Sequence, residues 1–339
     1  MHTVMANTTK RKKKKKGLYF IPVIVLLCIA LVITIFFTNQ QNQEEVSNET
    51  IEDYHQVTYQ NKTYEYNTSI VSILLLGIDK DKQNQDTLGQ SDAVALLLLD
   101  RENKKMSFLA IPRETITEIE MFDVQGQSLG WQESYLNLAY AYGHDQASGC
   151  MRTSQAVSRL LNNVPVVRYA SMNLVALPEV HDLVGKIQVK VPNDSLVDVN
   201  KSWTKGKVVT VTKDNVEDFV RSRDITKNFT SQTRLERQEV YMKAFYERFC
   251  ALLEGNIENM INKVYNIFKS DNICTNITYT DLKDFCQMIL TYDFDESKDY
   301  YTLEGIYEAG DVHNTFTYDQ EKLDALVIQL FYKEKREKV

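Results

Sequence analysis

The sequence predicts an α/β fold in which helices cover a mainly buried sheet. Two apolar runs, Ile70 to Leu76 and Ala93 to Leu99, are typical of strands that are buried on both faces. After them, further strand candidates alternate with segments that carry apolar residues at helical spacing. Such alternation favours a layered α/β architecture, and about 300 residues are enough to bury a core.

An apolar run from Leu18 to Thr38 precedes this region and contains no charged residue. About twenty apolar residues are enough for a helix to cross a membrane. A cleaved signal peptide is the alternative, but its apolar core is about 7–15 residues long and ends in small residues, whereas Phe36 and Phe37 stand here. The run is therefore predicted to be a retained anchor.

The orientation of this anchor follows from the basic run Lys10 to Lys16, because Lys and Arg beside a span stay on the cytoplasmic side. The predicted organisation is a cytoplasmic tail (residues 1–17), a span (18–38), an acidic extracellular stalk (39–68) and one exported domain (69–339). A nuclear or nucleic-acid-binding patch is the weaker interpretation of the basic run, because the span follows it at once.

The elements of the exported domain follow from the same patterns. The strand at Ile70 to Leu76 is expected to be central, and a polar turn at Glu102 and Asn103 joins Ala93 to Leu99 to Met106 to Ile111 as a hairpin. Further strands are predicted at Val167 to Asn173 and Ile187 to Val191, and helices at Cys150 to Leu161, Ala176 to Leu183, Gln232 to Leu253, Ile257 to Phe268 and Thr280 to Ile289, with Asp319 to Arg336 closing the chain.

The charge of the exported part argues against nucleic acid as a partner. Of 39 Lys and Arg residues, the seven in the basic run leave 32 against 46 acidic residues, all of which lie beyond the span. Proteins that bind nucleic acid usually carry the opposite balance. A phosphate ligand would therefore have to be held by a local basic cluster.

Four cysteines lie in the exported part, where disulfides persist. Cys150, Cys250, Cys274 and Cys286 lack the close spacing of a zinc site. They are interpreted as one or two disulfides or, alternatively, as inert buried thiols, and the sequence leaves their pairing open.

Acidic residues stand at the ends of the two central strands. Asp79 and Asp81 follow the first run, and Asp92 immediately precedes the second. Carboxylates at strand ends suit a ligand crevice, and one or two of them with substrate phosphates commonly hold Mg²⁺. The alternative is that Asp79 and Asp92 are simply turn residues.

A basic cluster interrupts the acidic domain. Its members are Arg221, Arg223, Arg234, Arg237 and the polar Gln238. Arg221 and Arg223 share one side of an extended segment, and the other three have helical spacing. Guanidinium groups match phosphate oxygens, and Arg113 is a further candidate; the alternative is a solvated helix face paired with Glu236 and Glu239.

Other catalytic patterns are absent from the sequence. It contains no Gly-rich phosphate loop, no Ser/His/Asp order and no His-x-x-x-His pair. His181 is interpreted as a packed or surface histidine rather than as a ligand.

Taken in order, short motifs between Ser72 and Tyr332 resemble the LytR-CpsA-Psr family of bacterial cell-envelope phosphotransferases. They are Leu75-Leu76-Gly77-Ile78-Asp79, Ser91-Asp92, Ile111-Pro112-Arg113, Leu136-Asn137-Leu138-Ala139-Tyr140, Asp182-Leu183-Val184-Gly185, Arg221-Ser222-Arg223 and Arg234-Leu235-Glu236-Arg237-Gln238. Each is a weak signal alone; together, behind a basic tail and one span, they are specific.

The resemblance implies a mixed central sheet flanked by helices and an apolar pocket for lipid. It implies transfer of a glycopolymer from a polyprenyl-pyrophosphate carrier to peptidoglycan, through a phosphodiester, outside the membrane of a Gram-positive bacterium. Asp79 and Asp92 would hold Mg²⁺. The catalytic groups around the pyrophosphate would be Arg113, Arg221, Arg223 and Arg234, with Gln238, Arg237 and Gln90 on the substrate.

Three positions depart from the pattern of that family. Gln90 stands where Arg is common, Glu114 where Asp is common, and Ser231 where Asp is common. The alternative function is therefore a polyprenyl-phosphate-binding scaffold or regulator without turnover. A transcription regulator is disfavoured, because about seventeen cytosolic residues leave no room for a helix-turn-helix.

Overall fold

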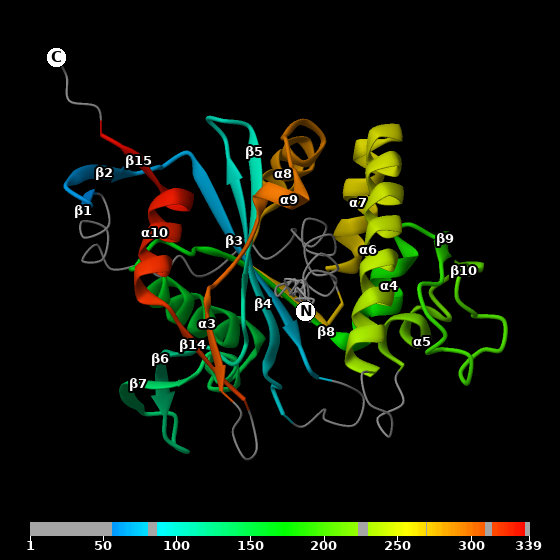
Figure 1. The fold of residues 1–339 in the computed structure, drawn as a ribbon, viewed down its shortest axis with the longest axis horizontal. Helices are drawn as coiled ribbons and strands as arrows, with labels where there is room; N and C mark the ends of the chain where they lie inside the picture. The colour runs from blue at the N-terminus through cyan, green and yellow to red at the C-terminus, as the bar shows by residue number, and fades with distance from the viewer. Residues whose placement is uncertain (1–55, 81–86, 223–229, 269, 309–313, 336–339) are drawn as a thin grey trace, which may run out of the picture.

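The computed structural model describes residues 56–80, 87–222, 230–268, 270–308 and 314–335, and its centre is a six-stranded mixed sheet in the order β11-β8-β3-β4-β5-β12 (Figure 1). These strands are Ile273–Thr275, Arg168–Asn173, Ile70–Ile78, Ser91–Asp100, Lys105–Ile111 and Tyr300–Thr302, respectively. The β3–β8 and β5–β12 pairs are parallel, and the other three pairs are antiparallel. The predicted α/β class, the central first strand and the β4–β5 hairpin are confirmed.

The two central strands are buried on both faces because alternate residues enter different cores. Ile73 and Leu75 of β3 belong to one core cluster, and Leu74 and Leu76 to the other. Burying one such side chain stabilises the fold by about 1.5–3 kcal/mol. The leucine-rich sequence of β3 and β4 is thus accounted for by two apolar environments rather than one.

Helices cover both faces of the sheet, which gives three layers (Figure 1). The first core cluster lies under α4 (Leu177–Asp182), α5 (Val216–Arg221), α6 (Thr230–Gly255), α7 (Ile257–Ile267) and α8 (Tyr279–Thr291). The second lies under α2 (Leu138–Ala141), α3 (Gln146–Leu160) and α10 (Gln320–Phe331). A short 3-10 turn, η2 (Leu174–Ala176), precedes α4, and α9 (Glu296–Asp299) precedes β12.

Two helices begin at capping boxes that lie before the predicted starts. At α3, the Ser148 backbone N–H donates to Asp145 Oδ1 over 2.7 Å, and at α8 the Asp281 N–H donates to Thr278 Oγ1 over 3.3 Å. Each box satisfies backbone donors that the first helical turn leaves without a partner. The capping residues therefore set where these helices start.

Among the described residues, four smaller sheets surround the central one. They comprise β1 (Gln56–Tyr59), β2 (Lys62–Tyr66) and β15 (Tyr332–Glu334); β6 (Ile116–Phe122) and β7 (Ser128–Tyr135); β9 (Ile187–Lys190) and β10 (Val208–Val211); and β13 (Gly305–Glu308) and β14 (Thr315–Tyr318). The sequence patterns identified β9 alone among these strands, because the rest are short or partly exposed.

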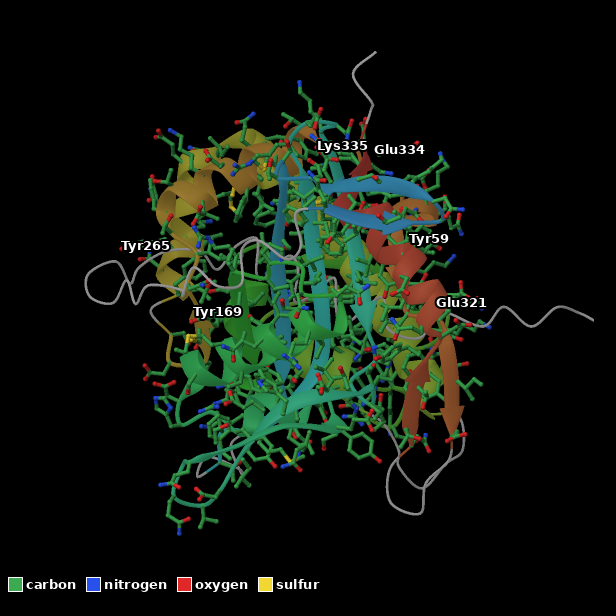
Figure 2. The ribbon with its side chains drawn as sticks, turned by 90° about the vertical axis from the view of Figure 1, so that its left-hand side faces the viewer. Tyr59, Tyr169, Tyr265, Glu321, Glu334 and Lys335 are labelled. Carbon is green, nitrogen blue, oxygen red and sulfur yellow. The ribbon has the colours of Figure 1, made fainter. Side chains whose placement is uncertain are left out.

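The first of these sheets joins the two ends of the described chain. β2 pairs with β15, with Tyr66 opposite Tyr332, and Figure 2 shows Glu334 and Lys335 beside the β1–β2 hairpin. Lys62 Nζ lies 2.9 Å from Glu334 Oε2. The prediction of one element from 319 to 336 was wrong, since α10 ends at Phe331 and pairing with β2 extends the chain beyond it. Residues 56–66, which fall within the range expected for the stalk, form the β1–β2 hairpin.

The predicted tail and membrane span, residues 1–38, lie outside the described residues. Within the part of the chain that the structure describes, no helix has both the length and the apolar character needed to cross a bilayer.

Cys150, Cys250, Cys274 and Cys286 are free thiols in the structure, as in the alternative to the disulfide interpretation. Cys150 on α3 is buried, and its thiol lies close enough to Cys274 on β11 for each to shift the pKa of the other. Burial raises the pKa of the Cys286 thiol to about 12. A thiol of this kind is a poor nucleophile.

His181 is packed in the core, the first of the two predicted alternatives, and joins three elements. Its ring on α4 is fully buried, and Nδ1 lies 2.7 Å from the Tyr241 hydroxyl of α6. Nε2 lies 3.2 Å from the carbonyl oxygen of Val211 in β10. A neutral ring satisfies both contacts, because Nε2 donates to the Val211 carbonyl oxygen and Nδ1 accepts from the Tyr241 hydroxyl. Burial lowers the pKa of His181.

This lowered pKa predicts a loss of stability in mild acid. The contribution of His181 is fully present above about pH 6.5, the value for an unfolded histidine, and is lost as the pH falls towards the folded pKa. We expect the free energy of unfolding in urea to decrease between pH 7.5 and pH 5.5, and His181→Gln to show a smaller decrease. An equal decrease in the variant would contradict this role.

Candidate functional site

Asp92 lies at a bulge in the central strand pair. Along β3 and β4 the partners run in register to Gly77 and Ala93, but the next residue of β3, Ile78, is opposite Ser91. Asp92 is thus an additional residue on β4, and bulges of this kind re-aim a side chain beside a functional site. Burial raises the pKa of Asp92, while the charge of Arg113 opposes that effect.

Asp79 is brought to the same place through Gln90. The backbone N–H groups of Asp79 and Asp92 both donate to the Gln90 carbonyl oxygen, each over 3.1 Å. The Gln90 N–H in turn donates to Asp79 Oδ1 over 2.7 Å. Gly89 precedes it with φ of +84°, and a Cβ there would lie 2.9 Å from Asp79 Oδ1. A glycine is therefore required both by the backbone conformation and by the space beside the carboxylate.

Arg113 follows β5 and is held between two carboxylates. Its Nη1 lies 2.5 Å from Asp92 Oδ1, and its Nε donates to Glu114 Oε1 over 2.7 Å. Burial alone would lower the pKa of Arg113, but the two carboxylates outweigh burial and raise it. Asp79, Asp92, Gln90, Arg113 and Glu114 thus form one group, here called the carboxylate group.

Asn137 belongs to this group, although sequence reasoning gave it no role. Its N–H donates to the Arg113 carbonyl oxygen over 3.2 Å, and its own carbonyl oxygen accepts from the Ser91 N–H over 3.3 Å. Its side-chain Nδ2 donates to Gln90 Oε1 over 3.0 Å. The side chain does not cap α2, which begins at the next residue. Asn137 therefore braces the β4 and Arg113 segments against each other. The sequence signal that could have identified it was its place in the motif Leu136-Asn137-Leu138-Ala139-Tyr140.

The oxygen atoms of the carboxylate group suit a hard divalent cation. Within the described residues no cluster of three or more Asp, Glu, His or Cys side chains forms a complete metal cage. Two carboxylates from neighbouring strand ends nevertheless fit Mg²⁺. This ion commonly takes one or two carboxylates and completes its octahedron with water and substrate phosphate. Asp79 and Asp92 are the residues that would hold it.

The second predicted group comes together where α5 ends and α6 begins. Arg237 Nη2 donates to the Ser222 carbonyl oxygen, and Gln238 Nε2 donates to the Val220 carbonyl oxygen over 3.2 Å. These bonds fix residues 220–222 against the first turns of α6. Arg221, Arg234, Arg237 and Gln238 are here called the arginine group.

Arg237 is a buried cation with unused donors. Its side chain is 0% exposed, and Nε and Nη1 have no hydrogen-bond partner among the described residues. Burial, with Arg234 nearby, lowers the pKa of Arg237 to about 10. A buried guanidinium without a carboxylate is costly, and an anion would supply both the charge and the acceptors. The interpretation of this region as a solvated helix face is wrong for Arg237.

The other predicted members are placed less fully. Arg221 Nη1 lies 3.3 Å from Glu217 Oε1, one turn earlier in α5, and the guanidinium is half-buried. Arg234 lies close enough to Arg237 for its charge to act on it. Arg223 and the side chain of Ser231 lie outside the described part of the structure.

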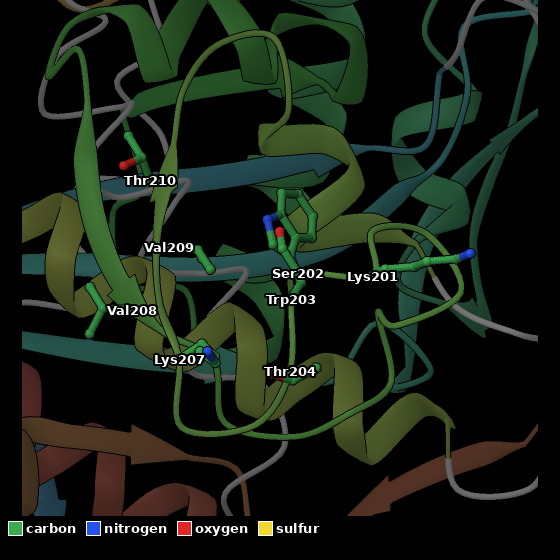
Figure 3. Close-up of a pocket in the computed structure, with 8 residues that line it drawn as sticks. All are labelled: Lys201, Ser202, Trp203, Thr204, Lys207, Val208, Val209 and Thr210. Carbon is green, nitrogen blue, oxygen red and sulfur yellow. The ribbon is translucent and has the colours of Figure 1, made fainter.

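The two groups lie at one end of the molecule. Figure 1 shows the C-terminal end of β3 and the start of α6 together at its lower end. A separate surface pocket of about 570 Å³, lined by residues 201–204 and 207–210, lies beside β10 (Figure 3) and contains no member of either group. Its Trp203 packs edge-on against Phe219, with ring centroids 5.5 Å apart. This pocket is therefore separate from both groups.

Comparison with protein families gives an extensive match. The model of the LytR_cpsA_psr family matches residues 33–331, which is most of the chain and includes both groups.

Two curated relatives match part of the chain. Polyisoprenyl-teichoic acid–peptidoglycan teichoic acid transferase TagU from Enterococcus faecalis is 26% identical over 213 residues, which are 62% of this chain and 63% of the relative. TagU from Bacillus cereus is 31% identical over 221 residues, which are 63% of this chain and 62% of the relative. Each match spans somewhat less than two thirds of the relative.

A solved structure shares the fold. The crystal structure of TagV from B. subtilis superposes with a TM-score of 0.54 and 24% identity, over 77% of this chain and 96% of that one. The central mixed sheet with flanking helices is common to both.

The buried Arg237 predicts stabilisation by a phosphate anion. Arg237→Met removes a buried charge that has unused donors, so we expect the free energy of unfolding without added anion not to decrease. Inorganic pyrophosphate at about ten times its dissociation constant should stabilise the natural protein by about 1.4 kcal/mol, and the variant not at all. Thermal unfolding of the full chain in detergent measures both.

Arg248→Met is the matched control, because Arg248 lies on α6 but is exposed. Equal stabilisation of Arg237→Met and the natural protein by pyrophosphate would show that Arg237 does not meet the anion.

Proposed function

Because this chain belongs to the LytR_cpsA_psr family, we propose that it transfers a glycopolymer from a polyprenyl-pyrophosphate carrier to a hydroxyl group of peptidoglycan, through a phosphodiester. The observation that carries the proposal is the pairing of the carboxylate group with a buried, under-satisfied arginine at the same end of the fold. The names of the two TagU relatives state the same kind of transfer for those proteins.

The proposed reaction is a phosphoryl transfer. The oxygen of the acceptor hydroxyl attacks the phosphorus that is bonded to the glycopolymer, and the bond from this phosphorus to the bridging oxygen breaks. Polyprenyl phosphate leaves with that bonding pair, and the hydroxyl gives up its proton. Positioning and charge neutralisation supply most of the catalysis in such reactions.

Each group has a part in this reaction. The arginine group would bind the phosphate of the leaving lipid and stabilise the charge that develops on it. Arg113, oriented by Asp92 and Glu114, would donate to the transferred phosphoryl group. Asp79 and Asp92 would hold Mg²⁺, which neutralises phosphate charge when bound.

The lipid chain needs apolar surroundings near the arginine group. The core cluster on the α6 side carries a fringe of half-buried apolar side chains, which includes Tyr246 and Leu252 of α6 and Met288 of α8. The arginine group lies on this same side of the sheet, at α5 and α6, so we propose it as the lipid side.

Transfer should depend on the carboxylate group. With a polyprenyl-pyrophosphate-linked glycopolymer and peptidoglycan, we expect Arg113→Met and Asp92→Asn to slow release of polyprenyl phosphate by about 100-fold or more, because each removes a group aimed at developing charge. Chelation of Mg²⁺ should have a similar effect, whereas Arg248→Met should retain the natural rate.

The same assay separates transferase from scaffold. Gln90, which stands where Arg is common in the family, accepts a hydrogen bond from Asn137 through its side chain. Turnover by the natural protein excludes the scaffold. If the natural protein binds the lipid without turnover, and Gln90→Arg with Ser231→Asp gains turnover, this chain is a binding protein or regulator.

The chain is also proposed to be anchored by residues 18–38 with its domain outside. In protoplasts that express the full chain with a tag at each end, external protease should remove the C-terminal tag and spare the N-terminal tag, since the basic run stays inside. Recovery of the protein from the medium without its N-terminal tag would indicate a cleaved signal peptide instead.

A further inference from the structure

The β13–β14 hairpin is fastened directly to the segment that carries Arg113. The Phe316 N–H of β14 donates to the Glu114 carbonyl oxygen over 2.9 Å, and Thr115 forms an isolated parallel bridge with Phe316. Phe316 is buried in the core. The position of the hairpin is therefore set by the same residues that orient the carboxylate group.

Tyr307 lies on the other strand of this hairpin, directly opposite Phe316. The two ring centroids are 4.8 Å apart, so Tyr307 rests on a buried ring, yet half of Tyr307 (50%) remains exposed. Burial, together with the Glu114 carboxylate, raises the pKa of Tyr307 to about 12, and the charge of Arg113 opposes the increase. The phenol is thus close enough to both charged residues for their fields to act on it.

The hairpin and the arginine group lie on opposite sides of the sheet. Phe316 belongs to the core cluster under α3 and α10, whereas the arginine group follows α5 and begins α6. Figure 1 shows β14 on one side of the central sheet and α6 on the other. Arg113 follows the end of β5, a strand of the sheet itself, and stands between the two sides.

This arrangement matches the geometry of phosphoryl transfer. The attacking and leaving oxygens lie roughly in line on opposite sides of the phosphorus. If polyprenyl phosphate leaves on the arginine side, then the attacking hydroxyl approaches from the hairpin side, where a sugar ring would come next to Tyr307. The face of a pyranose carries C–H groups, which pack well on the electron-rich face of an aromatic ring.

We propose that the exposed face of Tyr307 is the platform for the acceptor sugar, the residue of the peptidoglycan glycan whose hydroxyl attacks the phosphorus. This inference rests on the proposed transferase function and names the side from which its acceptor enters. Tyr307 is a specificity-determining residue for the acceptor, and the glycopolymer donor does not depend on it.

The test uses the full chain in detergent and soluble glycan fragments of peptidoglycan as the probe. Tyr307→Ala should raise the KM for the fragments about threefold to tenfold, the range for loss of one aromatic stacking contact. The KM for the donor should be unchanged, and Tyr307→Phe should remain within about twofold of the natural protein, because it keeps the ring.

Ile306→Ala is the matched control. Ile306 is 68% exposed and adjacent in β13, but successive strand residues point to opposite faces, so this change should leave both KM values unaltered. Thermal unfolding should show that all three variants fold, since the substituted side chains are at least half exposed.

Direct binding of the fragments, measured by calorimetry without donor, separates this inference from the proposed function. Binding that is weakened in Tyr307→Ala supports the platform even if the natural protein has no turnover. Unchanged binding and KM in Tyr307→Ala would overturn it, as would an increase in the donor KM alone or a natural protein that binds no fragment.

Discussion

The site depends on the register of the β3–β4 pair. Both strands bury alternate residues in two different cores, so a slip by one residue would exchange every side chain between them. The register is therefore fixed along the strands, and the additional residue in β4 is accommodated at the end, opposite Gly77 and Ile78, where Asp92 lies. Core packing thus determines that the bulge falls at Asp92, and Arg113 and Asn137 are organised around it.

The two groups of the site illustrate different ways of holding charge. In the carboxylate group, Arg113 is paired with Asp92 and Glu114, and with Asp79 the carboxylates outnumber the one cation, which suits a divalent metal ion. In the arginine group, Arg237 is buried with only a carbonyl oxygen as its described partner. The cation of the carboxylate group is paired without a ligand. Arg237, in contrast, lacks the counter-charge and the acceptors that an anion would supply. A ligand with a doubly charged phosphate would supply that charge and could contact both groups at once.

Much of the fold was predictable, because Ile70 to Leu76 and Ala93 to Leu99 carry their signal in consecutive residues. The strand at Tyr332–Glu334 was missed, since its partner Tyr66 lies far away in the sequence and no local pattern reveals the pairing. Asp79, Asp92 and Arg237 were proposed as site residues through a family resemblance. Local spacing alone favoured turn residues for the two aspartates and left a solvated helix face open for Arg237. The bracing by Asn137, the bulge at Asp92 and the approach of Tyr307 to Arg113 depend on contacts between distant segments, which only the structure supplies.

The pairing of β2 with β15 has a consequence for how the domain is completed. β2 and β15 pair only when residues near 66 and residues near 332 come together. Contacts between such distant segments form late, because a long loop must close first. If the N-terminal side is held at a membrane during export, this closing step happens at the membrane surface and only after almost the whole chain has crossed. β2, which is joined to the N-terminal side through β1, would then pair last, and tension on the anchor would reach the β2–β15 pair through the β1–β2 hairpin.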